Sequence, residues 1–434
     1  MMYLSLGNSK DIVSFKEALF KGLAPDKSLY FPTQIDKLSN DFWKNLKKMN
    51  TTSLAYEVLR NFTKKEIPKG NLFEIIKKTI DFDFPTVSVE KNLYSLELFH
   101  GPTMAFKDVG AKFMSGCMNY FIEAENFKNK VTVLVATSGD TGGAVANGFL
   151  GVDGVDVVIL YPKGRVSEIQ ELQLTTLGKN VSALEIDGYF DECQEMVKKS
   201  FLDSDLNKKL MLTSANSINI ARWIPQMLYY FIAYKNLNIE NLKVVFSVPS
   251  GNFGNLCAGM LAKKMGLPIN HFVASTNKND TVPNFMKTGE YKKQKTISTI
   301  TNAMDVGDPS NFVRILNLYN NDFQKLKKEL TAYSFSDKET ISGMRELYFK
   351  SKYLLDPHGA TAYLGLKKYL LNNPRKIGVF LETAHPIKFL ETVENAIEKK
   401  IIIPEKILKL RKKKKEKTSI KNYKELKSFL LSNN

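Results

Sequence analysis

A glycine-rich segment, Ser250-Gly-Asn-Phe-Gly-Asn255, has the residue types of an anion-binding turn. It follows an apolar run at 243–248 and precedes an amphipathic stretch at 255–265, so it is predicted to join a strand to a helix. At such a junction backbone N–H groups and the helix N-terminus point at one anion, and glycine permits positive φ and close approach. Neither the lysine of a nucleotide-binding P-loop nor GxGxxG spacing is present. The segment predicts a phosphate site, with a plain strand-to-helix turn as the alternative.

A second segment, His100-Gly-Pro-Thr-Met-Ala-Phe-Lys-Asp108, places Lys107 after apolar and small residues. Partial burial would lower the pKa of this lysine and leave a nucleophilic amine, which Schiff-base chemistry requires. The alternative is an ordinary surface lysine, and it is a strong one because the chain contains 62 Lys and Arg residues. Lys107 is therefore a candidate that needs support from other segments.

Both segments lie in a chain that alternates predicted strands and helices. Apolar runs predict strands at 131–136, 155–161, 180–186, 243–248, 269–274 and 378–381, and amphipathic stretches such as 142–149 predict helices between them. This alternation predicts an α/β fold with two parallel sheets. Ligands bind at the carboxyl ends of such strands, where three loops lie: Ser138-Gly-Asp-Thr-Gly-Gly143, Ser250 to Asn255, and the loop that begins at Thr383.

Changes in residue pattern along the sequence also predict a division of the chain into four parts. Up to about residue 85, amphipathic stretches such as 41–48 and 72–80 alternate with glycine and proline breaks. We predict a mainly helical N-terminal unit at 1–93 and a smaller α/β domain with Lys107 at 94–220. A larger α/β domain with the glycine-rich segment follows at 221–400, and a basic C-terminal tail at 401–434.

The net charge of +17 is concentrated near the end of the chain. Residues 399–434 carry an excess of ten positive charges, which leaves about +7 for the rest. We attribute this to a solvated surface and a basic C-terminal helix. The alternative is a nucleic-acid-binding protein, which would need aromatic residues interleaved with the basic ones, and only Tyr423 and Phe429 lie there.

Other residues argue against metal, membrane and secretion. Cys117, Cys193 and Cys257 are widely separated and are predicted to be reduced core residues. No CxxC pair or HExxH spacing occurs, so no metal site is predicted. No apolar run approaches the ~18 residues of a membrane span, and residues 1–10 lack a secretory pattern. We expect a cytoplasmic protein without membrane or nucleic-acid partners. For His358 and His385 a site role and an ordinary buried role are equally open.

Five segments together resemble the threonine synthase family, in the tryptophan-synthase-β-like group of pyridoxal-phosphate enzymes. They are 100–108, Ala136-Thr-Ser-Gly-Asp-Thr-Gly142, Asn216-Ser-Ile-Asn219, Val248-Pro-Ser-Gly-Asn-Phe-Gly254 and Thr383-Ala-His-Pro386. The resemblance covers about residues 10 to 400. It implies two parallel-sheet domains of the tryptophan-synthase-β-like fold with a mainly helical N-terminal unit.

The resemblance also implies roles for individual residues. Lys107 would be the catalytic lysine that carries pyridoxal 5′-phosphate, and Thr383 would meet the pyridine nitrogen. The cofactor phosphate would be held by Gly251, Asn252, Phe253, Gly254 and Asn255. Ser138 and Asp140 would face the cofactor, and the substrate would be bound by Thr141, Ser214, Asn216 and Arg222. Purely structural contacts remain the alternative for Asp140 and Arg222.

The activity implied by the resemblance is conversion of O-phospho-L-homoserine and water to L-threonine and phosphate, by a monomer or homodimer. A related lyase that only eliminates phosphate from a phosphorylated hydroxy amino acid is the alternative within the same fold. Glu382 stands where glycine is frequent in the family, and we expect its side chain to point away from the pyridine nitrogen.

Overall fold

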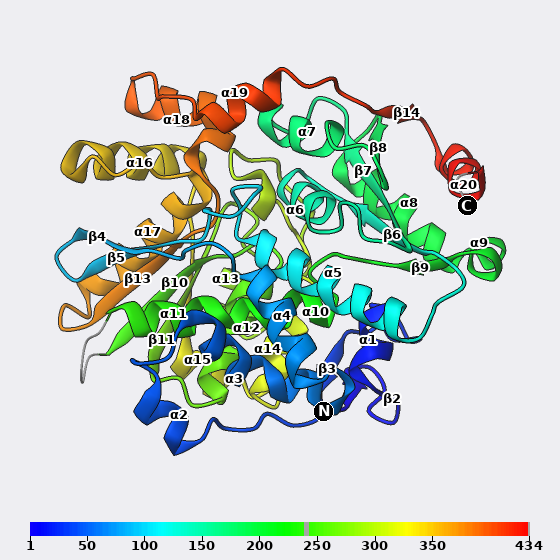
Figure 1. Ribbon diagram of the computed structural model, residues 1–434. Helices are drawn as coiled ribbons and strands as arrows, with labels where there is room; N and C mark the ends of the chain where they lie inside the picture. Colours follow the sequence, from blue (N-terminus) through cyan, green and yellow to red (C-terminus); the bar gives the residue numbers. More distant parts are fainter. Residues whose placement is uncertain (238–242, 433–434) are drawn as a thin grey trace.

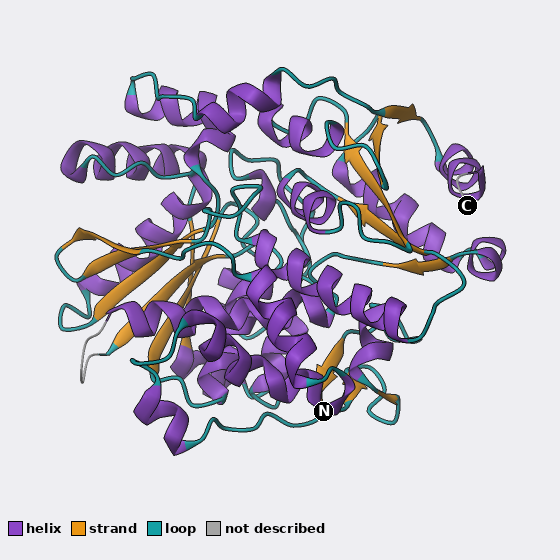
Figure 2. Ribbon diagram, in the orientation of Figure 1, coloured by secondary structure: helices purple, strands orange, loops and turns teal. Residues whose placement is uncertain are grey.

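Two sheets with helices on both faces form the molecule, together with a helical N-terminal unit (Figures 1 and 2). This computed structural model describes residues 1–237 and 243–432. The predicted α/β fold with two parallel-sheet units and a mainly helical N-terminal unit is confirmed. Within the described ranges, none of the helices combines the length and the apolar character that crossing a bilayer requires.

The larger sheet has six strands and is parallel except at one edge. In spatial order they are β12 (Leu330–Ser334), β11 (Ile269–Thr276), β10 (Val244–Pro249), β13 (Ile377–Glu382), β5 (Leu93–Glu97) and β4 (Thr86–Glu90), with β4 antiparallel to β5. Val244, Phe246 and Val248 pack with α11 (Met227–Leu237) and α12 (Gly254–Lys264), whereas Val245 packs with α17 (Pro357–Leu371). Successive side chains of a strand point to opposite faces, so both faces are buried. Helix α16 (Asp337–Ser351) packs outside α17.

The smaller sheet has five parallel strands. Their spatial order is β14 (Thr418–Ile420), β8 (Val181–Ile186), β7 (Val155–Pro162), β6 (Val131–Ala136) and β9 (Met211–Thr213). Val133 and Val135 of β6 share a core with α5 (Lys107–Ala124) and α6 (Asp140–Gly148), and Leu134 shares another with α8 (Phe190–Leu202) and α20 (Tyr423–Ser432). Helix α7 (Glu168–Thr175) packs on α6.

The N-terminal unit is drawn in blue in Figure 1 and lies in the lower part of the molecule in that view. It contains the antiparallel strands β1 (Tyr3–Ser5), β2 (Ile12–Val13) and β3 (Tyr30–Pro32), and the helices α1 (Phe15–Lys21), α2 (Asn40–Asn45), α3 (Thr51–Thr63) and α4 (Lys69–Thr79). The stretches predicted at 41–48 and 72–80 correspond to α2 and α4. Helix α4 packs on α5, which joins this unit to the smaller sheet.

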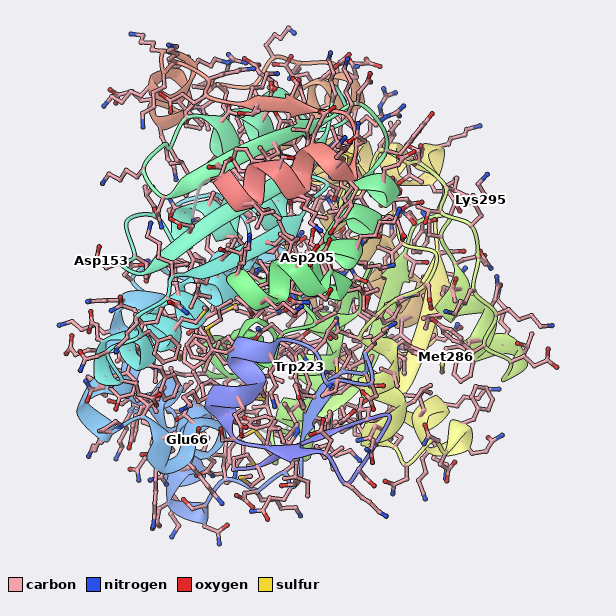
Figure 3. All side chains as sticks on the ribbon, turned by 90° about the vertical axis from the view of Figure 1, so that its right-hand side faces the viewer. Glu66, Asp153, Asp205, Trp223, Met286 and Lys295 are labelled. Carbon is pink, nitrogen blue, oxygen red and sulfur yellow. The ribbon has the colours of Figure 1, made fainter. Side chains whose placement is uncertain are left out.

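Short helices complete the connections between these layers. They are α9 (Ser204–Lys209), α10 (Ile220–Trp223), α13 (Thr281–Thr288), α14 (Phe312–Leu318), α15 (Phe323–Glu329), α18 (Leu390–Ile397) and α19 (Glu405–Arg411). Trp223, labelled in Figure 3, is fully buried at the end of α10, where the guanidinium of Arg314 stacks on its ring at 4.4 Å. Arg314 also donates to the carbonyl oxygens of Tyr30 and Ile218, so it fixes α14 to the N-terminal unit.

Each sheet contains a strand from a part of the chain that the predicted boundaries assign elsewhere. Strand β5 lies beside β13 in the larger sheet, although most of it falls after the boundary predicted at residue 94. Residues 418–420 of the predicted tail pair with β8 and complete the smaller sheet. The division into four parts remains a prediction; the structure describes which strands share a sheet.

The basic C-terminal segment packs on the unit of the smaller sheet. From α18 it passes α19 at the top of Figure 1 and continues to β14 and α20 on the right. Its cations pair with acidic groups of the smaller unit: Arg411 with Glu168 at 2.7 Å, Lys417 with Glu185 at 2.6 Å, and Lys427 with Asp205, labelled in Figure 3, at 2.9 Å.

Exposed ion pairs of this kind contribute little each, so buried apolar side chains must hold the segment. Ile407, Ile420, Leu426 and Leu430 are all almost fully buried. The predicted basic helix is therefore a packed part of the fold. Residues 433–434 of the predicted tail lie outside the described residues.

Replacing Leu426 with alanine should destabilise the protein by about 2–4 kcal/mol, because a fully buried side chain is lost from the core under α20. Leu408 of α19 is 44% exposed, so Leu408→Ala should cost less than about 0.5 kcal/mol. Thermal unfolding of both variants at one scan rate measures the difference. Equal midpoints would contradict a packed C-terminal segment.

Candidate active site

One cavity lies where the carboxyl ends of β6, β10 and β13 meet. It brings together twelve of the thirteen predicted site residues: Lys107, Ser138, Asp140, Thr141, Asn216, Arg222, Gly251, Asn252, Phe253, Gly254, Asn255 and Thr383. Ser214 does not line it. The Ser214 hydroxyl donates to Asn216 Oδ1 at 3.3 Å, and the residue lines a neighbouring groove instead. The geometry gives no support to the substrate contact predicted for Ser214.

The turn that precedes α5 holds Lys107 against the end of β13. Buried Asp108 accepts hydrogen bonds from Thr103 N at 2.9 Å and from Thr103 Oγ1 at 2.5 Å, which closes the turn. Phe106 N donates to Thr383 O at 2.9 Å, and His385 N donates to Met104 O at 3.1 Å. These backbone bonds fix Lys107, the first residue of α5, relative to Thr383.

The amine of Lys107 lies at the cavity without a polar partner. Among the described residues, Nζ makes no hydrogen bond or ion pair, and its ring contact is with Phe106, 5.8 Å from the centroid. Burial lowers the pKa of Lys107 to about 8; Asp140 opposes this shift, whereas Lys388 and Arg222 add to it. A lysine in this state is partly neutral near pH 8 and can act as a nucleophile.

The glycine-rich turn after β10 has the predicted strand-to-helix geometry. Helix α12 begins at Gly254 with no side-chain cap, so its first N–H groups remain available to an anion. The positive φ that we expected at a glycine is taken by Phe253, at 60°. Gly251 is needed for close approach, because a Cβ there would lie 2.7 Å from Met304 Cα. Asn255 Oδ1 accepts from Tyr230 at 2.8 Å, which leaves Nδ2 unpartnered.

The turn after β6 forms a second helix start with available N–H groups. Thr137 Oγ1 accepts from Gly139 N at 3.0 Å and from Gly142 N at 2.8 Å, which shapes the turn at Ser138 and satisfies one N–H of the first turn of α6. The N-cap residue Gly139 provides no side-chain cap, so the N–H groups of Asp140 and Thr141 can meet a carboxylate.

Asp140 is occupied by protein groups. Its carboxylate accepts from Gln170 at 2.9 Å and pairs with Lys388 at 2.7 Å. Burial alone would raise the pKa of Asp140, but the ammonium groups of Lys388 and Lys107 hold it well below its usual range. Asp140 is therefore an ionised group in the wall of the cavity, and its Oδ1 is engaged by Gln170 and Lys388.

Asn216 and Arg222 also line the cavity. Asn216 Nδ2 donates to Ala136 O at 3.2 Å, and Arg222 Nη1 donates to Ala215 O. Arg222 is 3% exposed, and burial lowers its pKa to about 10. Its Nε is buried without a hydrogen-bond partner among the described residues and lies against Gly110, where an added Cβ would be 3.0 Å from it.

Glu382 is buried but does not line the cavity, which agrees with the expected orientation away from Thr383. Its Oε1 accepts from Asp356 N at 2.5 Å, and Gly359 leaves room for its Oε2. Burial and neighbouring Asp356 raise the pKa of Glu382 well above its usual value, so its protonated form is favoured relative to an exposed glutamate.

Several residues of the site had no role assigned from the sequence. His358 lines the cavity with Nδ1 2.6 Å from Asp356 Oδ1, whereas His385 caps a helical turn by accepting from Ile387 N at 3.1 Å. Gln226 and Asn302 line the cavity with unpartnered buried oxygens. Lys388 stands behind Asp140. Its position in the Thr383 to Phe389 stretch was the only sequence signal for it.

Comparison with known proteins identifies the class. A family model described as pyridoxal-phosphate dependent enzyme matches residues 83–381, and models for the threonine synthase N terminus and C-terminal region match 2–80 and 360–430. Solved structures of lower identity share the fold, such as threonine deaminase isoform 2 from Solanum lycopersicum at 15% identity and TM-score 0.56. The chain belongs to the pyridoxal-phosphate-dependent enzymes.

Relatives of higher identity narrow this class. Threonine synthases of Buchnera aphidicola and Escherichia coli are 44% and 42% identical to the chain, with 94% of each chain covered in both comparisons. The crystal structure of threonine synthase from Escherichia coli matches over 100% of both chains with TM-score 0.94 and 39% identity. That of pyridoxal-phosphate-bound threonine synthase from Brucella melitensis covers 99% of this chain and 98% of its own, with TM-score 0.92 and 33% identity. The chain belongs to the threonine synthase family.

The cavity has the donor set that pyridoxal 5′-phosphate requires. Lys107 supplies an unpaired amine for the aldehyde, and the uncapped start of α12 supplies N–H groups for the phosphate. Buried unpartnered atoms of Asn255, Arg222, Asn302 and Gln226 lie in the same wall. Unsatisfied buried polar groups are costly, so these atoms are suited to a polar ligand.

Gly251→Ala should weaken pyridoxal phosphate binding about ten- to hundredfold, because displacing the backbone at Met304 costs about 1–3 kcal/mol. At Gly254 the added Cβ meets the end of a side chain, Asn311 Nδ2, at 3.3 Å, so Gly254→Ala should cost less than about tenfold. Titration of both apo-proteins with the cofactor gives the affinities. If Gly251→Ala lowers the apo-protein melting temperature and leaves affinity unchanged, the turn is only structural.

Proposed function

We propose that this protein converts O-phospho-L-homoserine and water to L-threonine and phosphate. One observation carries the proposal: a single cavity contains an unpaired amine and two separate sets of anion donors. The first set is the uncapped start of α12, and the second combines the uncapped start of α6 with Arg222. A phosphorylated substrate that reacts beside a phosphorylated cofactor needs both sets.

Each residue of the cavity would have its own role in this reaction. Bound pyridoxal phosphate would supply a ring that accepts electron density when bonds next to the substrate amine are broken. Lys107 Nζ would take a proton from the substrate carbon and return it, since it has no competing partner and a pKa of about 8. Thr383 would face the pyridine nitrogen. Thr141 and Asn216 would orient the substrate carboxylate, and the Arg222 guanidinium would hold the phosphate before and as it leaves.

The products test the proposal. Purified protein with pyridoxal phosphate and O-phospho-L-homoserine should release threonine and phosphate in equal amounts, measured by mass spectrometry and a phosphate assay. Lys107→Ala should remove this activity, because no other described residue offers an unpaired amine in the cavity. Formation of a 2-oxo acid and ammonia in place of threonine would identify the related lyase instead.

Arg222→Gln should lower kcat/KM about thirtyfold or more, because losing a buried charge-assisted contact costs about 2 kcal/mol or more. The absorption spectrum of the bound cofactor should not change. Arg222→Lys should restore part of the loss, since lysine supplies the charge without the planar fork. A near-normal kcat/KM in Arg222→Gln would mean that another group holds the substrate phosphate.

The proposal extends to assembly and compartment. We propose a monomer or homodimer, in which each chain carries the amine and both sets of anion donors in its own cavity. Cys117, Cys193 and Cys257 are buried and unpaired, which supports a reducing compartment such as the cytoplasm.

A further inference from the structure

Lys388 makes a buried ion pair directly behind the cavity. It lies on the helical turn Pro386–Phe389 and is 1% exposed. Its Nζ is 2.7 Å from Asp140 Oδ1 and donates to Thr103 O at 3.0 Å. It therefore joins three segments of the site: the turn before Lys107, the start of α6, and the loop after β13.

Asp140 is the carboxylate that would otherwise become a partner of Lys107. The negative charge of Asp140 acts on the Lys107 amine, yet Nζ of Lys107 forms no ion pair within the part of the chain that the structure describes. Lys388 and Gln170 both contact Oδ1 of Asp140. The ion pair of the Asp140 carboxylate is thus made with Lys388 and not with Lys107.

We propose that Lys388 is a positioning residue that engages Asp140 and so keeps the Lys107 amine unpaired for attachment of the cofactor. The proposal rests on the role of Lys107 in the proposed function. In the attachment step, Lys107 Nζ in its neutral form bonds to the aldehyde carbon of pyridoxal phosphate. Its two protons leave with the aldehyde oxygen as water, so no oxidant or reductant is needed.

The charges around Lys107 predict the direction in which its pKa shifts when Lys388 is removed. A buried carboxylate without a cation is costly, so Asp140 would turn to the next ammonium group, which is Lys107. Lys107 would then gain a partner and lose the repulsion of Lys388. Both changes favour the protonated amine, so the pKa of Lys107 would rise from about 8 and attachment would need higher pH.

The test measures Lys107 itself in the apo-protein. Acetic anhydride acetylates neutral amines, and peptide mass spectrometry measures how fast Lys107 is acetylated at each pH. The rate should rise with pH with a midpoint near pH 8. In Lys388→Met the midpoint should rise by about one unit or more, which leaves about tenfold less neutral amine at pH 7. Covalent attachment of pyridoxal phosphate should slow by the same factor at pH 7 and recover at high pH. A defect of packing alone would not recover with pH.

Four further variants separate the effect of charge from that of packing. Asp140→Asn should move the Lys107 midpoint downward, and the double variant Asp140→Asn with Lys388→Met should lie between the two single variants. Lys388→Arg keeps the charge and should stay near the wild-type midpoint. Lys406→Met is the matched control, because Lys406 approaches Gly101 O at 3.4 Å and is not paired with Asp140.

A Lys388→Met midpoint at or below that of the wild type would overturn the proposal. If Lys388→Met does not fold, Asp140→Asn decides: a midpoint at or above the wild-type value overturns it equally. Failure of the proposed function looks different. The cofactor would then be found on another lysine after borohydride reduction, or no threonine would form, whatever the midpoints of Lys107.

Discussion

A lysine amine must remain unpaired beside two anion-binding turns, and much of the structure serves this constraint. A buried lysine ordinarily takes a carboxylate partner or loses its charge. Here Asp140 pairs with Lys388 at 2.7 Å and Asp108 is closed into the turn by Thr103, so neither carboxylate is available to Lys107. Since Lys388 follows β13 and Asp140 follows β6, this constraint also sets how the two sheets meet.

The charge balance of the cavity follows from the same arrangement. Lys107 and Arg222 line it as cationic groups, and Lys388 stands behind Asp140. Asp305 also lines the cavity, and burial raises its pKa to about 6, so it is still largely ionised at pH 7. The cationic groups Lys107, Arg222 and Lys388 outnumber the carboxylates of Asp140 and Asp305 only when Lys388, behind the wall, is counted. Such a site favours ligands with phosphate and carboxylate groups.

The sequence predicted the parts of this structure that depend on local patterns. The run 131–136 became β6 residue for residue, because a strand buried on both faces needs a continuous apolar run. The glycine-rich turn was found for a similar reason. Strands β9 and β14 were missed, since three residues beside polar or basic segments carry no strand signal. The positive φ of Phe253 was also missed, because propensity assigns it to glycine and only tertiary structure imposes it on phenylalanine.

Lys388 shows why the remainder of the site could not be predicted. Its partner Asp140 begins helix α6, about 250 residues earlier in the chain, and no local pattern distinguishes Lys388 from the other lysines of a lysine-rich chain. The same holds for Ser214, whose place in a motif suggested a ligand contact, while the path of the turn directs its hydroxyl to Asn216. Motifs locate the segments of a site, and the fold decides which side chain in each segment reaches the cavity.

The pairing of β14 with β8 has a consequence for biosynthesis. Residues 418–420 are translated after every other strand of the smaller sheet, so β8 has an open edge while the rest of that sheet is already on the outside of the ribosome. Open edges of apolar strands pair readily with other chains. The nascent protein is therefore most exposed to misassembly in the interval before its C-terminal segment emerges, and chaperone binding during translation would have its greatest effect there.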